Sequence, residues 1–268
     1  EMVLSADAGV EMAEADGALA QGVISAESLT ISVGEDGSIG TSETALRLSG
    51  VESLTLTKGD IQGLYLDVAG GQDFTLAQAI NASEGVGVHT QGSLVVEDNM
   101  SAGTGGIELQ SQGAIKINDQ TSLDSAADLS LTAGSDLAAQ GAELSGTAVA
   151  LKAGTGAVVA GSASITASKG LEVSAQESVD LDAAQLSAEE ALTLTAGADL
   201  TAQGAALSGA SVALTAETGA VAANGASITA ADKLDVSSKG DIGLAGAKLS
   251  TTGAAVSLSS AEGAVDLS

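Results

Sequence analysis

Apolar residues alternate with polar or small ones in short runs that recur at intervals of about 21 residues. The commonest run is an apolar residue, any residue and a second apolar residue, as in Leu129-Ser130-Leu131. Such pairs lie at 46/48, 66/68, 86/88, 107/109, 129/131, 149/151, 171/173, 192/194, 212/214, 234/236 and 256/258. Alternation with a period of two predicts a strand with one buried face, and the Gly or small polar residues that follow predict a turn.

Two further runs follow within each interval. The second lies at 54/56, 74/76, 94/96, 115/117, 179/181 and 242/244. The third has the form Ala-x-(Leu/Ile)-(Ser/Thr) from Leu144 onward, and its apolar residues are evenly spaced: Leu123, Leu144, Ile165, Leu186, Leu207, Ile228 and Leu249. Three short strands per interval predict an all-β parallel β-helix of about twelve coils, in which Leu144, Leu186 and Leu207 form one inward column.

The sequence also has a longer repeat of about 63 residues, which contains three of the 21-residue intervals. Residues 128–146, DLSLTAGSDLAAQGAELSG, recur at 191–209 as ALTLTAGADLTAQGAALSG. More than half of the positions in 128–190 match those in 191–253. We therefore expect one β-helix over 1–268, with regular coils at 128–268 and degenerate coils of the same rod at 1–127.

Composition supports a narrow core. The chain has 268 residues and 44% hydrophobic content, but it has no Pro, Cys or Trp and only one Phe and one Tyr. Small and aliphatic side chains fill a thin cylinder and would not fill a wide globular interior. The lack of Cys excludes disulfides and Cys-based zinc sites.

Charge and hydropathy exclude some partners. The net charge of −27 repels nucleic acids and anionic lipid surfaces, so we expect neither as a partner. No apolar run approaches the roughly 20 residues that a membrane-spanning helix needs, so we expect no membrane insertion of this segment. The chain starts at Glu1 and stops at Ser268 within the repeat pattern, and we expect it to be a fragment of a larger chain.

The words ALTLTAGADLTAQGAALSG (191–209) and KLDVSSKGDIGLAGAKLS (233–250) resemble the haemagglutinin repeats of filamentous-haemagglutinin-like exoproteins. The resemblance is close from about residue 128 onward. It implies a right-handed parallel β-helix, export by two-partner secretion and a location outside a Gram-negative-type bacterium. It also implies a shaft whose partners are further coils of the same chain or identical subunits, with host-cell, neighbouring-cell or matrix receptors contacted through other regions. An autotransporter passenger is the main alternative.

A polysaccharide-active enzyme on a β-helix is the alternative from another class. Such enzymes need acidic residues clustered with a Lys, Arg or His in one groove. The only His is His89 and the only Arg is Arg47, which we expect about two coils apart, roughly 10 Å along the axis. We therefore expect no enzyme, no catalytic or cofactor-binding residues and no dedicated metal site.

Calcium and ice are two further ligands that acidic or threonine-rich solenoids can bind. Asp136, Asp199 and Asp241 recur after Gly turns, so weak nonspecific calcium binding between stacked carboxylates is one hypothesis, although no calcium-binding motif is present. An ice-binding solenoid would need Thr-x-Thr on successive coils. The outward pairs of the first strands are Ser130/Thr132, Ala150/Lys152, Glu172/Ser174, Thr193/Thr195, Ala213/Thr215, Asp235/Ser237 and Ser257/Ser259, and only one of these has two threonines.

Overall fold

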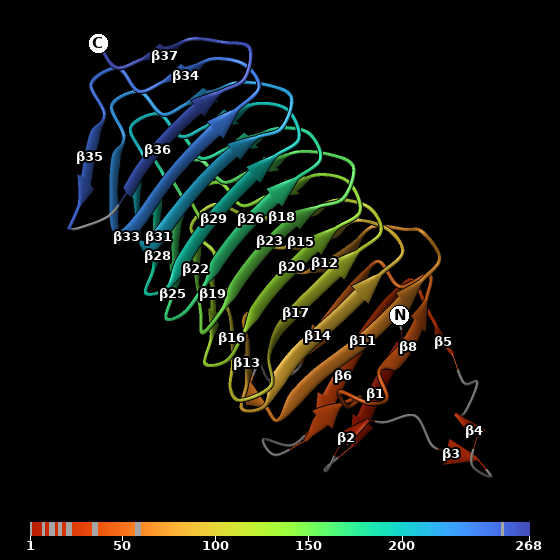
Figure 1. The fold of residues 1–268 in the computed structure, drawn as a ribbon. Helices are drawn as coiled ribbons and strands as arrows, with labels where there is room; N and C mark the ends of the chain where they lie inside the picture. The colour runs from red at the N-terminus through yellow and green to blue at the C-terminus, as the bar shows by residue number, and fades with distance from the viewer. Residues whose placement is uncertain are drawn as a thin grey trace.

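The computed structural model describes residues 2–6, 9–10, 14–15, 18–19, 23–33, 37–56, 60–252 and 255–268. In this part of the chain every helix or strand is a β-strand, and all strand pairings but one are parallel. Successive turns of the chain lie about 21 residues apart and number about 11, close to the predicted twelve. Figure 1 shows them as one elongated stack with the chain ends at opposite ends. The predicted all-β fold, a parallel β-helix, is confirmed.

One coil shows how the three predicted strands are arranged. In it β20 Leu129–Ala133 is the first strand, β21 Leu137–Ala138 the second and β22 Glu143–Gly146 the third. Each pairs with the matching strand of the next coil: β23 Val149–Ala153, β24 Val158–Val159 and β25 Ser164–Ala167. The prediction of three short strands per coil is therefore confirmed.

The second strands form a 13-stranded parallel sheet. In order they are β1 Met2–Ala6, β6 Ser28–Val33, β9 Ser53–Leu56, β12 Phe74–Leu76, β15 Leu94–Val96, β18 Ile115–Ile117, β21, β24, β27 Val179–Asp180, β30 Leu200–Thr201, β32 Val221–Ala222, β34 Ile242–Gly243 and β37 Val265–Asp266.

The first and third strands belong to one 22-stranded sheet. They are joined because β31 Ala206–Ala216 and β33 Ser227–Ser238 each run through both positions. The other first strands are β5 Ile24–Ser25, β8 Leu46–Ser49, β11 Gly63–Ala69, β14 Gly85–Thr90, β17 Gly106–Ser111, β20, β23, β26 Leu171–Ala175, β29 Ala191–Ala196 and β36 Ala255–Ser260. The other third strands are β10 Asp60–Ile61, β13 Ile80–Ala82, β16 Met100–Ala102, β19 Ser122–Ser125, β22, β25, β28 Gln185–Ala188 and β35 Lys248–Thr251. The short strands β2 Gly9–Val10 and β7 Ser38–Ile39 pair in line with the start of β11 and so continue the first-strand ladder.

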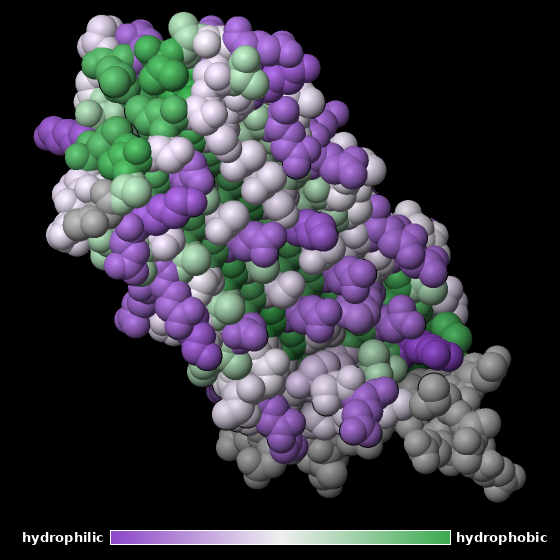
Figure 2. Space-filling view, viewed as in Figure 1, coloured by the Kyte–Doolittle hydropathy of each residue, from purple (hydrophilic) through white to green (hydrophobic). Residues whose placement is uncertain are grey.

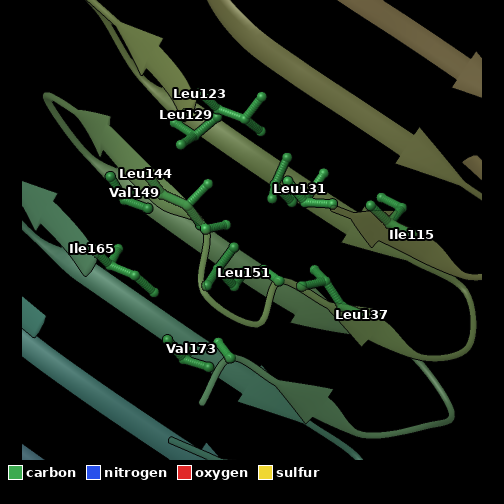
Figure 3. Close-up of a cluster of buried hydrophobic side chains, with 14 of the residues drawn as sticks. Ile115, Leu123, Leu129, Leu131, Leu137, Leu144, Val149, Leu151, Ile165 and Val173 are labelled. Carbon is green, nitrogen blue, oxygen red and sulfur yellow. The ribbon is translucent and has the colours of Figure 1, made fainter. Parts of the chain in front are cut away.

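The core is a set of aliphatic columns that run along the stack. The third-strand column is in register from coil to coil, in the order Leu123, Leu144, Ile165, Leu186, Leu207, Ile228 and Leu249. Leu144, Leu186 and Leu207 therefore share one column, as predicted. Figure 3 shows Leu123, Leu144 and Ile165 on successive coils, with first-strand residues such as Leu131, Leu151 and Val173 beside them. Burying these faces stabilises the fold by about 25 cal/mol for each Å² of apolar surface.

The register differs from the sequence spacing at two places, and at one of them Leu76 is aligned with Leu54 instead of Leu56. At the other, spacing equates the pair Leu66/Val68 with Val86/Val88, but in the structure Val86 is aligned with Leu64 and Val88 with Leu66. A shift of two residues leaves the inward residues inward, because side chains alternate with a period of two. The outward neighbours do change, and Tyr65 comes to lie beside Gly87.

A left-handed backbone residue recurs at one corner of seven successive coils, shortly before the third strand. These residues are Gln120 (φ 63°), Gly141 (64°), Ser162 (59°), Ala183 (59°), Gly204 (66°), Gly225 (67°) and Gly246 (66°). Glycine adopts this conformation without steric strain, whereas it costs other L-residues about 1–2 kcal/mol. The coil geometry therefore imposes the conformation even on Gln120, Ser162 and Ala183.

The N-terminal end departs from the coil pattern predicted for residues 1–127. There β3 Glu14–Ala15 and β4 Ala18–Leu19 pair antiparallel, and Figure 1 draws them outside the stack, beyond β5. The strands from β8 onward follow the regular parallel order.

We expect Leu207→Asp to lower the free energy of unfolding by about 3–5 kcal/mol, because it buries an unpaired carboxylate in the column. Leu207 is 1% exposed, whereas the adjacent Ala206 is exposed on the opposite face. Ala206→Asp is therefore the matched control and should unfold near the parent midpoint. Equal midpoints for the two variants in urea unfolding followed by circular dichroism would contradict the register.

We expect Gly204→Ala to destabilise the fold by about 1–2 kcal/mol through backbone strain alone. A Cβ at Gly204 would meet no atom within 4 Å, so packing does not contribute. The reverse change, Ala183→Gly at the same corner, should raise stability or leave it unchanged, because relief of strain opposes the added chain entropy. Thermal unfolding of both variants checks the sign, and a more stable Gly204→Ala variant would contradict the argument.

Candidate functional site

A loop in the N-terminal half interrupts the first-strand face. Strand β11 pairs with β7 through Leu64 and Ile39 and with β8 through Leu66 and Leu46. Between these pairs β11 has only Tyr65, whereas the preceding coil has the whole segment 40–45. The loop is braced at its ends, because the Thr41 and Thr44 backbones exchange hydrogen bonds of 2.9 and 3.1 Å. This insertion forms a wall beside Tyr65.

Tyr65 lies in a cradle made by glycines. A Cβ added to Gly63 would come within 2.8 Å of Tyr65 Cε2, and one on Gly87 within 2.9 Å of Cδ1. A Cβ on Gly85 would come within 2.7 Å of the Tyr65 hydroxyl oxygen. Real Cβ atoms essentially never make such contacts. The ring thus occupies space that only glycine leaves open.

The loop, the ring and the following coils enclose a groove of about 340 Å³, which we call the Tyr65 groove. Its lining residues are Thr41, Ser42, Ala45, Tyr65, Leu66, Glu84, Val86, Gly87, His89, Thr104, Gly105 and Glu108. Burial of the Tyr65 side chain raises the pKa of its hydroxyl above the ordinary value, and the Glu84 carboxylate raises that pKa further. The phenol is therefore neutral at physiological pH.

His89 and Arg47, the only histidine and the only arginine of the chain, lie two coils apart, as expected, with Asp67 between them. Asp67 is in register with Arg47 on one side and with His89 on the other. Arg47 Nε lies 3.8 Å from Asp67 Oδ2, and His89 Nε2 lies 3.7 Å from Glu108 Oε1. All four side chains are exposed, so these two contacts add little stability.

Sequence reasoning missed Tyr65, Glu84 and Glu108. The available signal was a pair of glycine-containing segments in neighbouring coils, at 63–65 and 85–87, around the only tyrosine. Correct alignment of the two coils is needed to place one segment beside the other, and the spacing misaligned them by two residues.

Asp136, Asp199 and Asp241 each accept a hydrogen bond from the neighbouring coil. Each Oδ1 accepts a backbone N–H of the next coil, from Ala157, Ala220 and Ala264 at 2.9, 2.8 and 2.8 Å. The carboxylates are two or three coils apart, so they are not stacked on one another. They tie the corners of adjacent coils together.

Each of these aspartates requires a glycine in the following coil. A Cβ on Gly156, Gly219 or Gly263 would collide with Oδ1 of Asp136, Asp199 or Asp241, respectively. An aspartate coil must therefore be followed by a glycine coil. This alternation explains part of the longer repeat, in which GSDL at 134–137 and GADL at 197–200 precede TGAV at 155–158 and 218–221.

The outward pairs of the first strands align as the sequence predicted. Ser130, Ala150, Glu172, Thr193, Ala213, Asp235 and Ser257 form one row, and the second members of the pairs form the next. Lys152, Glu172 and Asp235 interrupt the face with charge. It therefore lacks the uniform threonine array that ice binding would need.

No group of three or more His, Asp or Glu side chains suited to a metal ion occurs among the residues that the structure describes. Nor does the described part of the chain contain a helix with the length and apolar character needed to cross a bilayer.

A protein-family model described as "Haemagglutinin repeat" matches residues 5–119, 109–175 and 218–268 of the chain. A second model, described as "Hemagglutinin repeat", matches residues 151–220. The chain belongs to the haemagglutinin-repeat family. No curated protein and no solved structure matches it significantly. Repeats of this family are structural parts of adhesins and are not enzymatic, and their proteins are typically extracellular. The family and the β-solenoid together fit the shaft of a filamentous adhesin.

We expect Gly219→Ala to lower stability by about 1–3 kcal/mol, because the new methyl group displaces the Asp199 carboxylate from Ala220 N–H and comes within 2.8 Å of the Ala198 backbone. Adding Asp199→Ala should then cost much less than it does alone, with a coupling of about 1 kcal/mol or more. Gly170→Ala is the control, since its Cβ would make only an ordinary 3.7 Å contact. Additive effects of the two changes in a double-mutant cycle would show that the pair is independent.

Proposed function

We propose that this chain is a structural shaft segment of a large secreted bacterial surface adhesin or filament. The functional regions lie elsewhere in that protein, and the shaft holds them at a distance from the cell. The observation that carries the proposal is the unbroken register of the core columns over successive coils. Each coil buries its apolar faces against its neighbours, so length is gained by adding coils. A spacer needs length and stiffness, and this fold supplies both.

We further propose export by two-partner secretion and a location on the outer surface of a Gram-negative-type bacterium. The family membership and the lack of cysteine support this route. A chain without cysteine can cross the membrane unfolded and then fold outside the cell without forming disulfides. An autotransporter passenger has the same fold requirements. The full-length sequence distinguishes the two routes, through an upstream secretion domain or a translocator on the same chain.

The partner we propose for the C-terminal coil is another coil, either of the same chain or of an identical subunit. Val256, Val265 and Leu267 are 47%, 40% and 62% exposed there. Figure 2 shows hydrophobic surface gathered at that end of the stack, whereas the side carries many hydrophilic residues. A further coil would cover the apolar residues and pair with β36 and β37. Acidic side chains keep neighbouring rods apart, and salt screens that repulsion.

The shaft proposal is tested by removing residues 128–190 from the full-length protein on its cell. Residue 191 then takes the place of residue 128 in the coil register. We expect the protein to fold, to reach the surface and to support attachment as before, with a shaft shorter by about 14 Å for three coils. Negative-stain electron microscopy and an attachment assay measure these outcomes.

A deletion of residues 128–180 is the matched control. It leaves a broken coil, so we expect loss of the folded stack and of surface display. Loss of attachment after the in-register deletion, with fold and display intact, would instead place the functional residues within the segment.

A further inference from the structure

The Tyr65 groove combines three features that occur nowhere else along the described first-strand face. It has the only tyrosine of a chain without tryptophan. It has an inserted loop, residues 40–45, at the position where the next coil has the single residue Tyr65. It also has glycines at 63, 85 and 87, which leave room for the ring. A shaft needs none of these, because the coils from β20 onward stack without them.

The charges around the ring favour a positively charged ligand. Glu84 and Glu108 both line the groove and are exposed, and the lining has no Lys or Arg; its one histidine, His89, lies 3.7 Å from Glu108. The net charge of −27 adds a field of the same sign. An aromatic ring attracts a cation to its face, and Tyr65 is only partly buried. Anionic ligands are disfavoured by the same charges.

We propose that the Tyr65 groove binds a small organic cation that carries an alkylammonium group. The ammonium group contacts the ring of Tyr65, and the carboxylates of Glu84 and Glu108 balance its charge. Thr41, Ser42 and Thr104 offer hydroxyl groups to polar parts of the ligand. The volume of about 340 Å³ lies at the lower end of the range for small-molecule pockets, which suits a ligand of choline size.

The chain offers a direct measurement of binding. Tyr65 is the only tyrosine and there is no tryptophan, so the intrinsic fluorescence of the 268-residue chain reports on this ring. Choline is the probe, and 3,3-dimethyl-1-butanol is its neutral counterpart with nearly the same shape. We expect choline to change the Tyr65 fluorescence saturably and the neutral alcohol to bind at least about fivefold more weakly. Methyl glucoside should cause no saturable change.

Variants separate the groove from the general acidity of the rod. The pair Glu84→Gln and Glu108→Gln should weaken choline binding about fivefold or more, because it removes both carboxylates without changing shape. Glu172→Gln is the matched control, since Glu172 stands in the same outward row as Glu108 and has no aromatic ring near it. Tyr65→Leu, followed by isothermal titration calorimetry, should lower affinity about threefold or more. Its unfolding midpoint shows whether the fold persists.

Several outcomes would overturn the proposal. Equal binding of choline and its neutral counterpart would show a merely apolar groove. An equal effect of Glu172→Gln would show diffuse attraction to the rod, and saturable binding of methyl glucoside alone would assign the groove to neutral sugars. If choline caused no saturable change in Tyr65 fluorescence, the ring would serve only to cover the backbone of the neighbouring glycines.

Discussion

The whole structure depends on parallel hydrogen bonding between coils, which fixes each residue about 4.8 Å from its counterpart one turn away. The stacked groups are chemically matched in the core, where leucine, isoleucine and valine follow one another. A residue cannot be chosen for its own coil alone, since it contacts the coils on both sides. Repetition in the sequence is a consequence of this constraint.

The parts of the fold that follow from local alternation could be predicted from sequence. The three strands per coil and the column of Leu144, Leu186 and Leu207 depend only on the alternation of side chains and the constant length of a coil. The groove depends on something else. Its ring, its glycines and its wall come from three coils, and a shift of two residues in the alignment separates Tyr65 from Gly87 without disturbing any inward residue. Hydrophobic pattern cannot detect such a shift, because both alignments bury the same face.

The aspartate corners show a second kind of information that single-sequence patterns hide. Asp199 was visible as a recurring acid, but its partner is a backbone N–H in the next coil, and its requirement is the absence of a side chain at Gly219. The pattern of hydrophobic and polar residues does not reveal that a position must lack a Cβ atom. In the longer repeat this requirement is visible only as a glycine that recurs at the same position.

The hydrogen bonds that join the coils run along the axis of the rod, and this direction has a mechanical consequence. A pull on the two ends loads those bonds directly, one coil interface after another. A coil that detaches from an end releases about 21 residues, and an extended chain of that length reaches about 70 Å, against the roughly 4.8 Å it occupied when stacked. Under flow or shear, such a rod would lengthen in large steps and limit the force that reaches whatever it holds.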